Sequence, residues 1–288
     1  MSALALGLIL VAAATHATWN FAAKRSHGGL PFVWVSSTFA LLLYAVAATA
    51  YWLWRAPVLP AGIWWIVVGS GLLKTAYSLL LQRAYRHGDF SLVYPLTRGT
   101  APLLATAAAI AIFGERPTPL ALAGGAIIVA SVFFLGGGTG LWHADRAHLR
   151  QGIRLGLACG ACVACYTVWD QRAVGHLQLP PVLYDAGTQL VLFCVVTPFA
   201  WRRRAEVAVA WREHRGEAAI VGLLSPVAYV LVLTAMSFTP VSYIAPAREI
   251  SILFGALFGA RLLKEADAGR RLLAAAGMVA GVVALALG

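Results

Sequence analysis

Long apolar stretches alternate with short polar connections along the whole chain. Apolar runs of roughly 17–25 residues have the length of a membrane-spanning helix. They predict ten spans: 3–23, 31–53, 61–82, 90–113, 119–137, 151–171, 180–200, 218–238, 241–262 and 270–288. The pattern therefore predicts an all-α integral membrane protein, organised as residues 1–137, a connecting loop at 138–150, and residues 151–288.

The two predicted units resemble each other at an offset of about 150 residues. Three matches stand out from the Ala- and Leu-rich background: Trp19-Asn20 with Trp169-Asp170, Pro95 with Pro246, and Arg98 with Arg248. Because each unit has five spans, an odd number, the second copy would cross the membrane in the opposite sense. We therefore expect ten transmembrane helices as two inverted five-helix repeats, an architecture of alternating-access transporters.

Composition and charge restrict the class of protein further. The 288 residues are 60% hydrophobic and 11% charged, whereas soluble globular domains carry about 25% charged residues. The net charge is +11, with sixteen Lys and Arg in the connections after odd-numbered spans and three in those after even-numbered spans. Positive charge concentrates in cytoplasmic loops. We therefore expect a multi-pass protein of a bacterial inner membrane with both termini outside the cytoplasm, and no nucleic-acid partner.

Ionisable residues within the predicted spans are the first candidates for function. Lys74, Arg98, Arg248 and Glu249 lie deep in spans, where a charge costs on the order of 2.5–3.5 kcal/mol. One interpretation is an internal Arg98–Glu249 pair, which the repeat symmetry would bring together. The other is a surplus of cations at the repeat interface, because one acid cannot neutralise three, and such a surplus suits a substrate carboxylate or phosphate.

Prolines and aromatic residues add to this candidate site. Pro95, Pro102 and Pro246 break helical hydrogen bonds and indicate cavity-lining segments at 90–113 and 241–262. Trp19 and Trp169 are either interfacial residues or a pair of gate residues. The candidate substrate-binding residues are Trp19, Asn20, Lys74, Tyr77, Tyr94, Arg98, Trp169, Tyr229 and Arg248.

Titratable groups inside the spans are candidates for proton coupling. They are Glu249, Asp170 and His16. His16 suits a proton relay because its ordinary pKa is close to neutrality, and it equally suits a hydrogen-bonded core position.

Other chemistries find no support in the sequence. Four cysteines without neighbouring His ligands fit small apolar residues better than a metal site. Phosphate-cradling glycine loops and protease motifs are missing, so we expect neither an enzyme nor a bound metal or cofactor. Glycines spaced by four, at 152–160, 255–259 and 277–281, permit close helix crossings within or between chains. They leave monomer and homodimer open.

Several segments resemble EamA-type members of the drug/metabolite transporter superfamily. They are residues 16–25, residues 84–95, Phe113-Gly114-Glu115-Arg116, Pro246-Ala247-Arg248-Glu249 and Leu263-Lys264-Glu265. The resemblance implies a basket of ten helices with spans 3, 4, 8 and 9 around a central cavity, and secondary transport of metabolites, often export. Members usually keep both termini in the cytoplasm, which is opposite to the orientation that the loop charges predict here.

The sequence thus predicts a membrane exporter of a small anionic or zwitterionic metabolite, such as an amino acid, which works by alternating access through a central cavity. The alternative is a flippase for a lipid-linked anionic head group, which the arginine-rich loops would gather at the cytoplasmic leaflet. In both cases the expected partners are the lipid bilayer and a small-molecule substrate.

Overall fold

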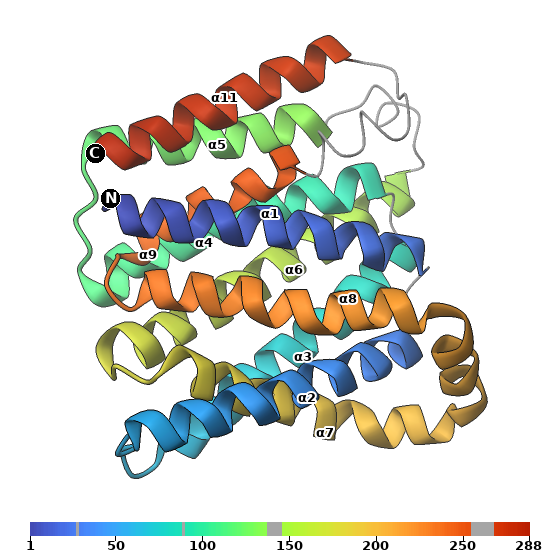
Figure 1. Cartoon of the computed structure of the whole chain (residues 1–288). Helices are drawn as coiled ribbons and strands as arrows, with labels where there is room; N and C mark the ends of the chain where they lie inside the picture. Colours follow the sequence, from blue (N-terminus) through green and yellow to red (C-terminus); the bar gives the residue numbers. More distant parts are fainter. Residues whose placement is uncertain (27–28, 88–89, 137–145, 255–267) are drawn as a thin grey trace.

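The computed structural model describes residues 1–26, 29–87, 90–136, 146–254 and 268–288. Within these ranges all regular structure is helical, and the long helices run back and forth along one common direction (Figure 1). The elements are α1 (Ala3–Arg25), α2 (Leu30–Arg55), α3 (Ile63–His87), α4 (Phe90–Phe113), α5 (Pro119–Gly136), α6 (Arg146–Gln171), the π-helix η2 (Arg172–His176), α7 (Pro181–Arg202), α8 (Arg204–Met236), α9 (Val241–Ala247), the 3₁₀-helix η3 (Arg248–Ile250) and α11 (Ala268–Leu287).

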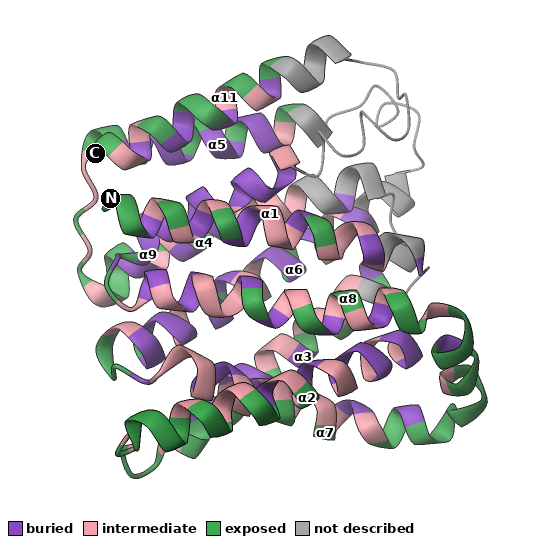
Figure 2. Ribbon diagram, viewed as in Figure 1, coloured by how far each residue is buried: buried purple, intermediate pink, exposed green. Residues whose placement is uncertain are grey.

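Length and composition make this bundle a membrane protein. In the described part of the chain, seven helices are long and apolar enough to cross a bilayer, and they fall in α1, α2, α3, α4, α6, α7 and α8. Two shorter apolar helices lie at 119–134 and 273–287. Large apolar side chains such as Leu53 and Leu273 are exposed, and exposed positions follow the outward faces of α2 and α11 (Figure 2). The multi-pass, all-helical expectation is confirmed, while the count of ten spans stays a prediction, since residues 255–262 of one span lie outside the described residues.

Neighbouring helices come from both halves of the chain. α1 and α2 pack against α8, α3 packs against α6 and α7, and α4 packs against α6 and α9. α5 and α11 lie side by side along their length (Figure 1). The two halves are therefore interleaved along most of the bundle.

Small residues allow two of these close approaches. Gly160 lies against Thr100 and the backbone of Thr97 in α4, and Gly281 lies against Ile128 and the backbone of Gly124 in α5. Gly160 of the 152–160 pattern and Gly281 of the 277–281 pattern therefore lie at helix contacts within the chain. Gly255 and Gly259 lie outside the described residues.

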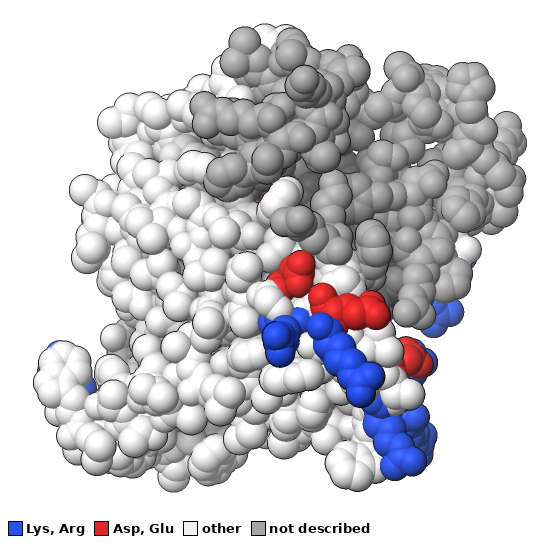
Figure 3. Space-filling model, turned by 45° about the vertical axis from the view of Figure 1, so that its right-hand side comes forward, with Lys and Arg blue, Asp and Glu red and all other residues white. Residues whose placement is uncertain are grey.

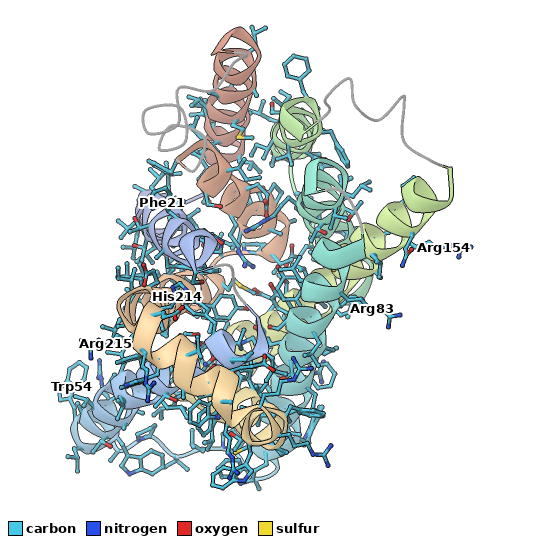
Figure 4. The ribbon with its side chains drawn as sticks, turned by 90° about the vertical axis from the view of Figure 1, so that its right-hand side faces the viewer. Phe21, Trp54, Arg83, Arg154, His214 and Arg215 are labelled. Carbon is cyan, nitrogen blue, oxygen red and sulfur yellow. The ribbon has the colours of Figure 1, made fainter. Side chains whose placement is uncertain are left out.

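The two ends of the bundle differ in charge. Both termini lie at one end, which we call the terminal end, and the amino group of Met1 donates to the carbonyl of Ala286 at 3.2 Å (Figure 1). The opposite end carries the turn from α7 to α8 and a group of Lys and Arg side chains (Figure 3). Its exposed arginines are Arg83, Arg154, Arg202, Arg203, Arg204, Arg212 and Arg215. Figure 4 looks onto this end and shows Arg83 and Arg154 on one side and Arg215 on the other.

Helix α8 begins well before the predicted span at 218–238. It starts at Arg204 and bends at His214, where φ is −128° and ψ is 19°. The first part is too polar for a hydropathy pattern to detect, but Ala210 is buried and Trp211 stacks on Phe39 of α2 with ring centroids 5.6 Å apart. Packing against α2 therefore makes a helix of a segment that we expected to be a loop.

Candidate functional site

Lys74 lies between two buried aspartates of the second half of the chain. Its Nζ is 2.8 Å from Oδ1 of Asp185 in α7 and 3.4 Å from Oδ2 of Asp170 in α6. The side chain of Asp170 is fully buried, and that of Asp185 is 9% exposed. We call these three residues the lysine–aspartate cluster. Since breaking a buried ion pair leaves a charge in a medium that cannot solvate it, the three side chains hold α3, α6 and α7 together.

Hydroxyl groups complete the coordination of both aspartates. Asp170 accepts hydrogen bonds from Ser70, from Tyr184 at 2.6 Å and from Tyr229. Asp185 accepts from Tyr44 of α2 and from Thr188, which also receives a hydrogen bond from Lys74 at 3.0 Å. These donors come from α2, α3, α7 and α8. These hydrogen bonds lower the free-energy cost of burying the two carboxylates, because each replaces one that water would make.

Asp185 was missed by the sequence analysis, and this omission made one interpretation wrong. The test that selected Lys74, an ionisable residue inside an apolar span, selects Asp185 as well, since it lies within the predicted span at 180–200. With it included, the deep charges balance, as three cations face three acids: Lys74, Arg98 and Arg248, and Asp170, Asp185 and Glu249. The expected surplus of cations is therefore wrong.

A second group of charges lies between α1, α4 and η3. Arg98 has its Nη1 3.7 Å from Oε2 of Glu249 and its Nη2 2.9 Å from Nε2 of His16. The pairing of Arg98 with Glu249 that the repeat symmetry predicted is confirmed. We call His16, Arg98, Arg248 and Glu249 the arginine–glutamate cluster. Trp19 closes it on one side, with its ring edge to face with the imidazole of His16 and the centroids 4.6 Å apart.

Tyr229 of α8 connects the two clusters. Its ring centroid is 4.4 Å from Nζ of Lys74 and 5.5 Å from Cζ of Arg248, and its hydroxyl donates to Asp170. Both cations therefore lie within cation–π distance of one ring. The predicted role of Tyr229 gains a geometric basis, because one tyrosine contacts both charged groups.

Irregular helical turns occur at both clusters. The 3₁₀-helix η3, which carries Arg248 and Glu249, begins two residues after Pro246, and the π-helix η2 begins two residues after Asp170. Pro246 cannot donate a backbone hydrogen bond. Such turns inside a helix often mark functional or strained positions. Here they set the positions of the charged side chains relative to the bundle.

Other predicted residues lie beside the clusters. Asn20 donates to the carbonyl of His16 in its own helix at 2.9 Å, and the ring of Tyr77 lies edge to face with that of Tyr166, with centroids 5.9 Å apart. The indole of Trp169 donates to the carbonyl of Ile66 at 2.9 Å. The side chain of Tyr94 lies outside the described part of the structure.

The formal charges of the two clusters are opposite. One lysine against two aspartates leaves one negative charge, and two arginines against Glu249 leave one positive charge. The ring of Tyr229 contacts a cation of each cluster, Lys74 and Arg248. Chemically, the first cluster favours an ammonium group and the second favours a carboxylate. In the described ranges, no three His, Cys, Asp or Glu side chains gather as a metal site would require.

Comparison with known proteins adds the family. Residues 3–137 and residues 150–287 each match the EamA-like transporter family. The chain belongs to this family. An EamA-like transporter of this kind is a multi-pass membrane protein of the drug/metabolite transporter superfamily, and its partners are the lipid bilayer and a small-molecule substrate.

A solved structure supports the fold of this EamA-like transporter. A crystal structure of a protein superposes with a TM-score of 0.77 at 18% sequence identity, over 100% of this chain and 98% of that chain. At this identity the likeness concerns the fold alone. No curated protein matches the chain.

Proposed function

We propose that this protein is a secondary transporter built from two inverted five-helix repeats, residues 1–137 and 151–288, joined by a connection at 138–150. The helix contacts support this arrangement. In this arrangement α1 corresponds to α6, α2 to α7 and α3 to α8. The contact of α2 with α8 therefore corresponds to that of α7 with α3, and the contact of α1 with α8 corresponds to that of α6 with α3. Both members of each pair occur. The ten spans would then form ten transmembrane helices that change access by a movement of one repeat against the other.

The substrate we propose is a small zwitterionic or anionic metabolite such as an amino acid. The observation that carries this proposal is the pair of oppositely charged clusters that both contact Tyr229. Asp170 and Asp185 suit an ammonium group, and the guanidinium of Arg98 suits a carboxylate, which it can bind through two parallel hydrogen bonds. Both clusters contain residues of both proposed repeats, so a relative movement of the repeats would change the substrate site.

Charge supports a proposal for the orientation in the membrane and for the coupling. The arginine-rich end lies in the cytoplasm of a bacterial inner membrane by the positive-inside rule, and the terminal end lies outside. We propose export, driven by exchange for protons at Glu249, Asp170 and His16, three of the titratable groups of the two clusters. Flux that does not respond to a pH gradient, or that responds equally in Glu249→Gln, would contradict the coupling.

Counterflow in proteoliposomes tests the function. Vesicles loaded with an unlabelled amino acid should accumulate the labelled form faster than empty vesicles. N-acetyl and methyl-ester derivatives should compete less well, because each lacks one of the two charges. No accumulation across amino acids, dicarboxylates and phosphorylated metabolites would contradict the proposal. Movement of a fluorescent anionic lipid between leaflets without solute flux would identify a flippase instead.

A further inference from the structure

A pocket opens at the terminal end, outside the two charged clusters. It has a volume of about 180 Å³ and lies between the α2–α3 turn, the start of α3 and the segment that follows α6. Its walls include Gly62, Trp65, Ile66, Arg172 and Leu177. Sites for drug-sized ligands span roughly 300–1,000 Å³. This pocket therefore suits a smaller molecule.

The π-helix η2 forms one wall of the pocket. The backbone amide of Leu177 donates to the carbonyl of Arg172 at 3.0 Å, and the amide of Leu179 donates to that of Ala173 at 3.1 Å. These wide turns bring Arg172 and Leu177, five positions apart, to the same pocket. Wide helical turns of this type are rare and occur often at functional sites. The wall therefore combines one guanidinium with an apolar surface.

Trp169 contacts two residues of the pocket wall and directly precedes Asp170 of the lysine–aspartate cluster. Its indole donates to the carbonyl of Ile66 and its ring lies edge to face with Trp65, with centroids 5.5 Å apart. The same ring covers Gly69, where an added Cβ would fall 2.6 Å from it. Ser70, which binds Asp170, follows Gly69 in α3. The path from Ile66 to Ser70 is one helical turn, about 6 Å along the axis.

We propose that this pocket is a second, outer binding site for the transported solute, with Trp169 as the partition between it and the lysine–aspartate cluster. The inference rests on the proposed transport function. Arg172 binds the carboxylate of an amino acid, and Trp65 and Leu177 contact its apolar side chain. A solute leaves the deep site by displacing the indole of Trp169 from the surface of Gly69 and then rests in the pocket before release.

The chemistry of the walls selects the ligand. A carboxylate matches the one cationic side chain among the pocket residues, and an aliphatic or aromatic side chain matches the ring of Trp65, which is 57% exposed. The short distance from Ile66 of the pocket to Ser70, which binds Asp170, favours the transported solute over a lipid. In this proposal only the solute moves between the deep site and the pocket.

Cysteine protection tests this site. The exposed Cys165 and Cys194 are replaced by Ser, and Leu177→Cys is added for reaction with a membrane-impermeant thiol reagent. The probe is the amino acid that gives the strongest counterflow. We expect it to slow modification about tenfold at about ten times its half-protecting concentration. Adding Arg172→Gln should abolish the protection.

Matched controls separate the possible outcomes. Leu120→Cys, an exposed position at the start of α5 on the same end, should react at a rate that the amino acid does not change. Arg116→Gln, another exposed arginine of this end, should leave the protection at Leu177→Cys intact. Counterflow without protection would overturn the outer site alone, and protection by anionic lipid but not by solute would do the same. Loss of counterflow in the unmodified protein would instead contradict the transport function.

Discussion

The carboxylate of Glu115 accepts a hydrogen bond from the backbone amide of Ser242 at 2.9 Å and thereby joins the end of α4 to the first turn of α9. Its other oxygen accepts the amide of Val241, also at 2.9 Å. The residue before α9 is Pro240, whose side chain cannot cap the helix. The first half of the chain therefore supplies the helix cap that the second half lacks.

Loss of this cap should be measurable. Glu115→Ala should lower the free energy of unfolding by roughly 0.5–2 kcal/mol, the usual effect of removing a cap, and Glu115→Gln should lower it less. Thermal melting in detergent measures both. Glu206→Ala removes an exposed carboxylate that pairs with Arg203 at 3.8 Å, and its effect should be close to zero. Equal effects at Glu115 and Glu206 would contradict the capping role.

Removal of Lys74 should destabilise the protein strongly. Lys74→Met leaves Asp170 and Asp185 buried without their cation, and such a change costs roughly 3–5 kcal/mol. We expect a low yield of folded protein and a large drop in melting temperature, and partial recovery when Asp185→Asn is added. Arg83→Met, an exposed arginine on the same helix, serves as the control and should melt close to the unmodified protein.

Arg98 should distinguish substrate binding from structure. Arg98→Lys keeps a positive charge near Glu249 but loses the planar fork of donors. Affinity should fall roughly 10- to 100-fold, since a hydrogen bond to a charged group contributes about 1.5–3 kcal/mol. Arg98→Ala should abolish binding. Ligand-dependent thermal stabilisation and counterflow measure both effects.

A double substitution tests the opposite role for Arg98. Arg98→Leu with Glu249→Leu removes the pair together, so the protein should fold. It should not transport, because the carboxylate-binding group is gone. Recovery of counterflow in this double variant would show that Arg98 serves only as the counter-ion of Glu249.

The seam between α5 and α11 should not tolerate a larger residue. A Cβ at Gly281 would lie 2.6 Å from Cγ1 of Ile128 and 2.7 Å from the carbonyl oxygen of Gly124. Gly281→Val should therefore lower stability by roughly 1–3 kcal/mol through overpacking. Gly7→Val in α1 is the control, because a Cβ there meets nothing within 4 Å. Similar melting of the two variants would argue against close packing at this seam.

Reporter fusions test the orientation. A periplasm-active phosphatase fused after Gly288 should be active and a cytoplasm-only fluorescent reporter should be dark, since the arginine-rich end carries the positive charge. The reverse result would place the termini in the cytoplasm, as is usual in the superfamily, and would contradict the proposed orientation.

The spans and one ion pair could be predicted from the sequence because each depends on a local or repeated signal. Apolar runs predict the helices. The repeat match of Arg98 with Arg248 predicted that Arg98 lies near Glu249, the neighbour of Arg248. The pairing of Lys74 has no such signal, because the repeat comparison matched Asp170 with an uncharged residue, Asn20, and gave no match for Asp185. Which carboxylate meets Lys74 depends on how α3, α6 and α7 pack.

Local backbone irregularities also escaped the sequence analysis. The π-helix after Gln171 contains no proline, and its wide turns are set by packing against its neighbours. The first turns of α8 are polar, and their packing against α2, through Ala210 and the stacking of Trp211 on Phe39, makes them part of the fold. Hydrophobic periodicity carries no information on either feature.

Asn20 and Asp170 occupy equivalent places in the proposed repeats, yet they differ in charge and in partners. In an assembly of two identical subunits, both places would carry the same residue, so the assembly would have either two acids or none at these places. In a single chain the two places can differ, so Asp170 lies 3.4 Å from Lys74 while Asn20 bonds within its own helix. The proposed repeats thus carry an asymmetric charge that a symmetric pair of identical subunits would have to carry twice.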